Sequence, residues 1–451
     1  MKTKTYRILT VVLIFQMIVF LSCAGWLLYD SRVDRSGWAE KDGVRYYRDF
    51  HARPVTGWLT ADGERYYLRE GGIPATGWLK LDTGVYFLAD DGAMQTGWTS
   101  VGGHTYYLGD NGVMRTGWLE MDGTLYYLPE GILATGWQEV DGRRYYFGTD
   151  GAMQTGFINV DGEIYYLDEA GRLLTGETVI GNHRYLFSDT GVMYTGWLVR
   201  EDGSRCYYNT AGAMETQWQE IGGKRYYFGS DGAARTGWYQ EGEYRYYFLE
   251  DGSAAVGPRE IDGQTHFFTP RGIEVILVNA AHPVPDYYER NLITVVDWTQ
   301  VDERCYAPLM RMLADCEAAG NAYIFNSGYR SINAQKEILE ARTREHMAAY
   351  ELDFDEARAK ALETVALPGA SEHHLGLAVD ILGDDAVAWL QEHCWEYGFI
   401  LRYTAEKQAI TGIVDEPWHF RYVGTEVSLD MKDSGLCLEE YLGACGDAPN
   451  V

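Results

Sequence analysis

Apolar and polar positions alternate in short runs from about residue 36 to residue 270, and the runs recur about every 20 residues. In one such unit, residues 135–140 (Thr-Gly-Trp-Gln-Glu-Val) alternate as a β-strand does, and residues 143–147 form a return strand. Asp141-Gly142 between them is the dipeptide of a type I′ turn. Each unit is therefore expected to be a β-hairpin. Gly-Trp pairs mark the phase at 37–38, 57–58, 77–78, 97–98, 117–118, 136–137, 196–197 and 237–238, and four degenerate units keep it.

A hairpin of 20 residues cannot bury its own aromatic face, so the units should stack into an all-β solenoid of about twelve hairpins. A second aromatic pair, such as Tyr145-Tyr146 or Tyr207-Tyr208, follows each Gly-Trp by about nine positions. The residue before this pair is variable, and it is Arg45, Arg65, Thr105, Leu125, Arg144, Ile164, Arg225 or Arg245. We expect most of these aromatic side chains to form the solenoid core and a minority to line ligand sites.

The pattern changes after residue 270, where Ala, Leu and Glu become frequent. The periodicity predicts an amphipathic helix over 302–319, a buried strand over 322–325, and helices over 332–350, 354–366 and 384–397. Further strands are expected over 377–381, 398–402 and 418–423. A short sheet with helices on its faces is an α+β domain, and residues 273–451 are numerous enough to bury a core of their own.

The first 30 residues have the pattern of an export segment. Lys2, Lys4 and Arg7 precede an apolar run over 8–21, and 22–24 (Ser-Cys-Ala) could be a cleavage site. The apolar character resumes over 26–29, which lengthens the run enough for an uncleaved membrane anchor. Residues 1–30 are therefore a signal peptide or an anchor. Both place the rest of the chain outside the cytoplasm, at the cell surface or secreted.

The charge and cysteine content of the chain limit the kinds of molecule that it can bind and the cross-links that it can form. The chain carries 38 Lys and Arg against 66 Asp and Glu, a net charge of −28, which excludes nucleic-acid binding as its main role. No pair of cysteines has metal-binding CxxC spacing, so we expect buried small side chains with one or two disulfides whose partners the sequence does not assign. Six of the seven cysteines would be exported, namely Cys206, Cys305, Cys316, Cys394, Cys437 and Cys445.

Three clusters of residues within 273–451 contain side chains that can bind a metal or take part in catalysis. Residues 371–380 place adjacent imidazoles on a loop and the carboxylate of Asp380 in the following strand, and residues 416–419 add Glu416 and His419. Two histidines and one aspartate suit a catalytic zinc ion with an open fourth position, and a free glutamate beside it suits a general base. Residues 327–331 add Arg330, a cation that could meet an oxyanion or a carboxylate.

These clusters closely resemble the VanY-type D-alanyl-D-alanine carboxypeptidases, which are zinc peptidases that act on peptidoglycan. The resemblance runs from about residue 277 to 424 and rests on S-G-Y-R-S at 327–331, S-x-H-x-x-G-x-A-x-D at 371–380 and E-P-W-H-F-R-Y-V-G at 416–424. His374 falls at a position that the motif leaves free. The resemblance implies His373, Asp380 and His419 as zinc ligands, Glu416 as base, Arg330 as the stabiliser of the developing charge, Ser371 and Gln335 as contacts to the C-terminal end of the peptide, and Tyr403 as a lining residue.

The repeats resemble the choline-binding and glucan-binding repeats of Gram-positive surface proteins. In choline-binding members, aromatic side chains of adjacent repeats form a cage around a quaternary ammonium. Those repeats commonly carry a tryptophan before the tyrosine pair, whereas this chain has arginine, threonine or an aliphatic residue there. The change removes one wall of the cage and favours a cell-wall glycan or teichoic acid over choline itself.

Together the segments predict an exported zinc carboxypeptidase that removes the terminal D-alanine from peptidoglycan stem peptides and is held on the wall by its repeats. Two alternatives remain open. One is an L,D-carboxypeptidase or a D,D-dipeptidase with the same zinc site, and the other is a wall-binding protein with an inert peptidase domain. Retention of three ligands, a base and an arginine argues against the inert domain.

Overall fold

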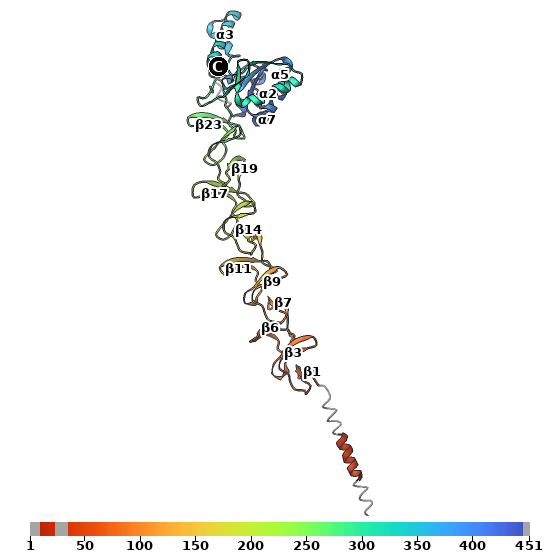
Figure 1. Ribbon diagram of the computed structural model, residues 1–451. Coiled ribbons are helices and arrows are strands. Elements are labelled where there is room, and N and C mark those ends of the chain that lie inside the picture. Colours follow the sequence, from red (N-terminus) through yellow and green to blue (C-terminus); the bar gives the residue numbers. More distant parts are fainter. Residues whose placement is uncertain (1–9, 23–34, 445–451) are drawn as a thin grey trace, which may run out of the picture. The chain divides into compact units, whose positions relative to one another are not determined.

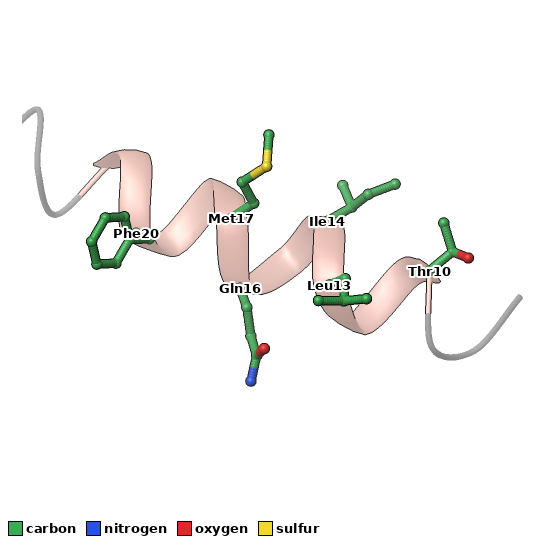
Figure 2. Close-up of a pocket in the computed structure, with 6 residues that line it drawn as sticks. All are labelled: Thr10, Leu13, Ile14, Gln16, Met17 and Phe20. Atoms are coloured by element: carbon green, nitrogen blue, oxygen red, sulfur yellow. The ribbon is translucent and has the colours of Figure 1, made fainter. Parts of the chain in front are cut away.

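The computed structural model describes residues 10–22 and 35–444, and the chain divides into two compact parts, residues 1–194 and 195–451. The first part begins with a helix over residues 10–22, whose side chains, including Leu13, Met17 and Phe20, project from it and are exposed (Figure 2). Among the described residues, none of the helices combines the length and apolar character needed to cross a bilayer. The rest of the predicted export segment, 1–9 and 23–30, lies outside the described residues.

Twelve antiparallel hairpins follow, eight in the first part and four in the second (Figure 1). In the first part the strands are β1 Gly37–Lys41, β2 Val44–Arg48, β3 Gly57–Ala61, β4 Glu64–Leu68, β5 Gly77–Leu81, β6 Gly84–Leu88, β7 Gly97–Val101, β8 His104–Leu108, β9 Gly117–Met121, β10 Thr124–Leu128, β11 Gly136–Val140, β12 Arg143–Phe147, β13 Gly156–Val160, β14 Glu163–Leu167, β15 Gly176–Ile180 and β16 His183–Phe187. In the second part they are β17 Gly196–Val199, β18 Arg205–Tyr208, β19 Gln217–Ile221, β20 Lys224–Phe228, β21 Gly237–Glu241, β22 Tyr244–Phe248, β23 Gly257–Ile261 and β24 Gln264–Phe268.

The turn chemistry explains most of the hairpins. Asp141 and Gly142 both have positive φ, 52° and 72°, which is the type I′ geometry that the Asp-Gly dipeptide predicts. The units are also bonded to one another through the backbone, as where the amide of Met153 donates to the carbonyl of Leu125 at 2.8 Å. The predicted stack of hairpins is therefore confirmed within each part.

Aromatic rings fill the space between successive units. The Trp118 ring lies 5.1 Å from Tyr127 of its own hairpin and 5.1 Å from Tyr145 of the next. From the second hairpin onward, the residue that ends the return strand, such as Leu128 or Phe147, is buried. Most aromatic side chains of the repeats therefore form the core, as expected.

One unit differs from its predicted register. In β17–β18, Trp197 pairs with Tyr207 and Val199 pairs with Arg205. The residue equivalent to the first tyrosine of the other units is thus the buried Cys206, and the predicted pair Tyr207-Tyr208 is wrong by one position. The sequence contains a Tyr-Tyr pair here as in the other units, but the pairing of the two strands shows that this pair lies one position further along its strand.

The C-terminal region is an α+β domain, as predicted. Its antiparallel sheet has the order β27-β28-β30-β29, and a separate hairpin, β25–β26, precedes it. The strands are β25 Leu292–Val296, β26 Thr299–Asp302, β27 Ile324–Ser327, β28 Ala378–Leu382, β29 Phe399–Leu401 and β30 His419–Tyr422. The helices are α2 Glu303–Ala318, α3 Ile332–Tyr350, α4 Phe354–Leu362, α5 Asp384–His393, α6 Gln408–Thr411, α7 Thr425–Ser434 and α8 Leu438–Tyr441. Short 3₁₀ turns are η1 Glu70–Gly72, η2 Pro129–Gly131, η3 Glu372–Leu375, η4 Cys394–Tyr397 and η5 Ala405–Lys407.

Most predicted elements of this domain are present with shifted ends. Helix α2 begins after Asp302, whose side chain accepts a hydrogen bond from the backbone N–H of Arg304. The strand expected over 322–325 is β27, and its description as buried is wrong, because β27 is an edge strand and Ile324 is 64% exposed. Helix α4 ends at Leu362, and the helix expected to reach 397 gives way to η4 after His393.

The last hairpins of the repeat array share a core with the α+β domain. Tyr246 and Phe248 of β22 and Phe267 of β24 cluster with Ile400 and Met431. The Tyr422 hydroxyl also donates to Glu243 at 2.6 Å. The end of the array is therefore a structural component of the C-terminal domain.

The cysteines act as small apolar side chains. Cys206, Cys305, Cys316, Cys394 and Cys437 are buried and form no disulfide with one another, so the expected disulfides are absent among the described residues. Burial raises the pKa of Cys305 and of Cys394 to about 12, which keeps both thiols protonated and unreactive.

Candidate metal centre

Two neighbouring strands and one short turn bring the predicted ligands together. Asp380 on β28 pairs directly with His419 on β30 in the antiparallel register, so their side chains lie side by side. His373 is supplied by η3, which ends at Gly376 in the left-handed conformation just before β28. The three ligands therefore come from positions that the backbone fixes.

The donor atoms of His373, Asp380 and His419 all lie within 4.8 Å of one another, and all three side chains are buried. Nε2 of His373 is 3.3 Å from one carboxylate oxygen of Asp380, and Nδ1 of His419 is 3.1 Å from the other. Nδ1 of His373 is engaged by the Gly328 carbonyl at 2.7 Å, which leaves Nε2 to face the cluster. Two imidazoles and a carboxylate in this arrangement are a donor set that could hold a transition-metal ion.

The electrostatics of the cluster fit a bound cation. Burial alone would raise the pKa of Asp380, but His373 and His419 hold it well below its usual range. Burial lowers the pKa of His419, yet the carboxylates of Asp380, Glu372 and Glu416 outweigh it and raise that pKa to about 9. Oδ1 of Asp380 is buried without a hydrogen bond of good geometry among the described residues. A cluster that attracts positive charge and contains an unsatisfied carboxylate oxygen is suited to a divalent metal.

The adjacent His374 is occupied elsewhere. Its Nδ1 lies 2.6 Å from the Arg330 carbonyl, and its Nε2 accepts a hydrogen bond from the Gly369 N–H at 3.1 Å. Both ring nitrogens are therefore used by the backbone. His374 fixes the loop, while His373 faces the cluster.

Glu416 lies beside the three predicted ligands. Its carboxylate is 3.6 Å from Nδ1 of His419. Burial, opposed by His419 and assisted by Asp380, raises the pKa of Glu416 to about 7. A carboxyl group with such a pKa can take up and release a proton near neutral pH.

Arg330 reaches the cluster from the loop after β27. Its guanidinium lies 3.7 Å from the Asp380 carboxylate and donates to the Ser327 hydroxyl at 3.0 Å. It also donates to the amide oxygen of Gln335 at 2.8 Å, while the amide nitrogen of Gln335 donates to the Ala366 carbonyl at 2.8 Å. Gln335 is thus bonded on both sides and sits behind the arginine.

Ser371 and Tyr403 lie at the edge of the cluster. Ser371 is buried directly before η3, and its hydroxyl makes no capping bond to that turn. The Tyr403 ring packs 4.9 Å from the His419 ring, and burial raises the pKa of its hydroxyl well above the usual value. Tyr403 therefore remains a neutral wall beside His419.

A buried ion-pair network behind His419 was missed by sequence reasoning. Glu372 accepts hydrogen bonds from Arg402 at 2.9 Å and from Arg421 at 3.0 Å, and its second oxygen lies 3.6 Å from Nε2 of His419. Arg402 also binds Glu439 through two nitrogens, at 2.9 and 2.6 Å. Burial alone would raise the pKa of Glu372, but the two arginines hold it well below its usual range. Glu372 is therefore an anionic support for the imidazole.

Comparison with known proteins agrees with this geometry. The family model described as D-alanyl-D-alanine carboxypeptidase, VanY, matches residues 299–425, which contain the whole cluster. The putative carboxypeptidase YodJ of Bacillus subtilis is 32% identical over 206 residues, covering 41% of this chain and 71% of the relative. The chain belongs to the VanY family. A D-alanyl-D-alanine carboxypeptidase of Enterococcus faecalis is 42% identical over 178 residues, covering 37% of this chain and 65% of the relative.

Solved structures and repeat models extend the comparison. A VanY D,D-pentapeptidase variant from a VanB-type vancomycin resistance cassette, solved with Zn(II), is 40% identical and has a TM-score of 0.36. The match covers 37% of this chain and 97% of that one. A choline-binding repeat model matches residues 95–131, 134–172, 174–217 and 215–258, and a putative cell wall binding repeat model matches 56–73 and 76–94. This VanY family member therefore joins its peptidase domain to wall-binding-type repeats.

Proposed function

We propose that the protein is a zinc-dependent D,D-carboxypeptidase that removes the terminal D-alanine from peptidoglycan stem peptides, held on the cell wall by its repeats. One observation carries the proposal: His373, Asp380 and His419 converge within 4.8 Å, with Glu416 3.6 Å from His419. Membership of the VanY family supplies the substrate class. Export by residues 1–30 and residence at the outer cell surface belong to the same proposal.

His373, Asp380 and His419 would hold the metal. When bound, zinc supplies a Lewis acid that makes water nucleophilic near neutral pH and polarises a carbonyl group. Glu416 takes a proton from the attacking water and delivers it to the departing D-alanine nitrogen. A carboxyl group with a pKa raised to about 7 suits both transfers.

The remaining residues position the substrate. Arg330 presents a fixed cation to the oxygen on which negative charge develops, because Ser327 and Gln335 hold its guanidinium in place. We assign Gln335 to this orienting task, since both ends of its amide are engaged within the protein. Ser371 and Tyr403 would contact the C-terminal end of the peptide.

Mass spectrometry of muropeptides tests the proposed reaction. Incubation of the zinc-loaded protein with pentapeptide muropeptides should give tetrapeptides and free D-alanine. Hydrolysis of free D-alanyl-D-alanine with the pentapeptides left intact would instead identify a D,D-dipeptidase, and conversion of tetrapeptides to tripeptides would identify an L,D-carboxypeptidase. The variant E416Q provides the control for contaminating peptidases.

A further inference from the structure

The tryptophans of the repeats fall into two groups according to what covers their rings. In six hairpins an arginine of the return strand lies over the tryptophan at a distance typical of cation–π contacts. The distances from guanidinium carbon to ring centroid are 3.7 Å for Arg45–Trp38, 4.5 Å for Arg65–Trp58, 4.6 Å for Arg144–Trp137, 4.7 Å for Arg205–Trp197, 4.3 Å for Arg225–Trp218 and 3.8 Å for Arg245–Trp238.

Several of these arginines are also held from the other side. Arg144 donates to the Thr190 carbonyl at 3.2 Å, and Arg225 donates to the Arg271 carbonyl at 2.7 Å, in each case 46 residues further along the chain. A guanidinium held between a tryptophan ring and a backbone carbonyl occupies the place on the ring where an external ligand would stack. It leaves no room on that ring face for a ligand from outside.

Three consecutive hairpins lack the arginine. Val85, Thr105 and Leu125 stand at its position, and the tryptophans of these units are exposed. The exposed fractions are 39% for Trp78, 40% for Trp98 and 41% for Trp118. Each ring still packs edge-on against a tyrosine of the next hairpin, at 4.7 Å for Tyr106, 5.2 Å for Tyr126 and 5.1 Å for Tyr145. The rings are therefore held rigidly while one face stays open.

The surroundings of the open faces suit a neutral sugar better than a cation. An ammonium cage needs a further aromatic wall, and that place holds only the aliphatic or hydroxyl side chains named above. Their cross-strand partners are Lys80, Ser100 and Glu120, which can hydrogen bond to sugar hydroxyls. Lys80 would also repel a cation bound beside Trp78.

We propose that the open faces of Trp78, Trp98 and Trp118 bind neutral sugar rings of a cell-wall glycan, and that the six arginine-covered faces are closed to ligand. The inference rests on the wall-tethering part of the proposed function. It places the glycan contacts made by tryptophan within residues 77–128 of the array.

The test closes the open faces with the side chain that the protein itself uses. The full chain and its variant V85R/T105R/L125R are compared, in chelator to stop turnover, for co-sedimentation with sacculi stripped of teichoic acid. Loss of three cooperating sites should raise the apparent Kd about 100-fold. The matched control T190R/T210R/S230R adds the same charge at exposed turn positions and should bind as the unmodified chain does. The converse variant R65T opens the Trp58 face and should lower the apparent Kd about threefold.

Unchanged binding by V85R/T105R/L125R would overturn the inference. Release of the bound chain by choline chloride, but not by equal sodium chloride, would also overturn it by identifying a cationic ligand. D-alanine release from a soluble pentapeptide, measured with zinc on the same proteins, reports the peptidase separately. A chain that ignores sacculi yet releases D-alanine would thus refute the glycan sites and the tether while leaving the proposed reaction standing.

Discussion

Replacing Glu416 with glutamine should stabilise the metal-free protein at high pH. The carboxyl group is 14% exposed, and burial with repulsion from Asp380, opposed by His419, raises its pKa from 4.5 to about 7. Between these pH values the unfolded chain has already lost the proton that the folded chain keeps. The free energy of unfolding therefore falls as pH rises through this window, and it stays lower above pH 7.

The magnitude follows from the pKa values. A pKa of about 7 in the folded protein against 4.5 corresponds to about 3 kcal/mol. The free energy of unfolding of E416Q minus that of the unmodified protein should therefore grow from near zero at pH 4.5 to about 3 kcal/mol at pH 8.

Hydrogen–deuterium exchange of peptides that contain β28 and β30 measures local opening without requiring the whole chain to unfold at once. The control is E340Q, which makes the same substitution at an exposed position of α3 and should give no pH-dependent difference. Saturating zinc should shrink the effect, because a nearby dication stabilises the carboxylate. A difference between E416Q and the unmodified protein that does not change with pH would refute the reasoning.

Three further outcomes follow from the same contacts. H419A should lose zinc and D-alanine release together, whereas E416Q should keep about one zinc per chain and lose ~10²–10⁴-fold in turnover, as metal analysis and a D-alanine assay would show. E439Q leaves a buried arginine partly uncompensated and should cost about 3–5 kcal/mol in the exchange experiment; a loss under 1 kcal/mol would mean that the ion pair is solvated. A chain that begins at residue 273 should melt about 10 °C below one that begins at residue 215, since it lacks the aromatic side chains of β22 and β24 from the shared core; equal melting temperatures would show that these hairpins are dispensable.

Local signals made the repeats predictable. The Asp141-Gly142 dipeptide specifies its turn because both residues tolerate positive φ, and the spacing of glycine and aromatic residues then sets the hairpin register. The exception is the unit with Cys206, where a longer turn shifts the tyrosines by one position. Residue identity alone cannot reveal such a shift, because pairing across the ladder decides which side chain enters the core.

The candidate site was predictable only in part. His373, Asp380 and His419 belong to short motifs with fixed spacing, and the pairing of β28 with β30 brings two of them together. The support from Arg402 and Glu439 could not be predicted, because these residues lie 30 and 67 positions after Glu372 and meet it only through tertiary packing.

In the sequence, arginine in place of the tryptophan before the tyrosine pair indicates only that one wall of a choline cage is missing. The structure shows more, since Arg45 and its equivalents occupy the ring faces themselves. Side-chain direction across a hairpin decides this outcome, and the sequence pattern fixes only which residues are neighbours.

The metal content of two adjacent histidine variants tests the central claim most directly. His373 and His374 are both buried, yet only His373 faces Asp380, while both nitrogens of His374 are bonded to backbone groups. Zinc per folded chain, measured after dialysis alongside D-alanine release, should fall to background with loss of activity in H373A. H374A should keep about one zinc per chain. Zinc retained by H373A and lost by H374A would contradict the ligand assignment and the mechanism built on it.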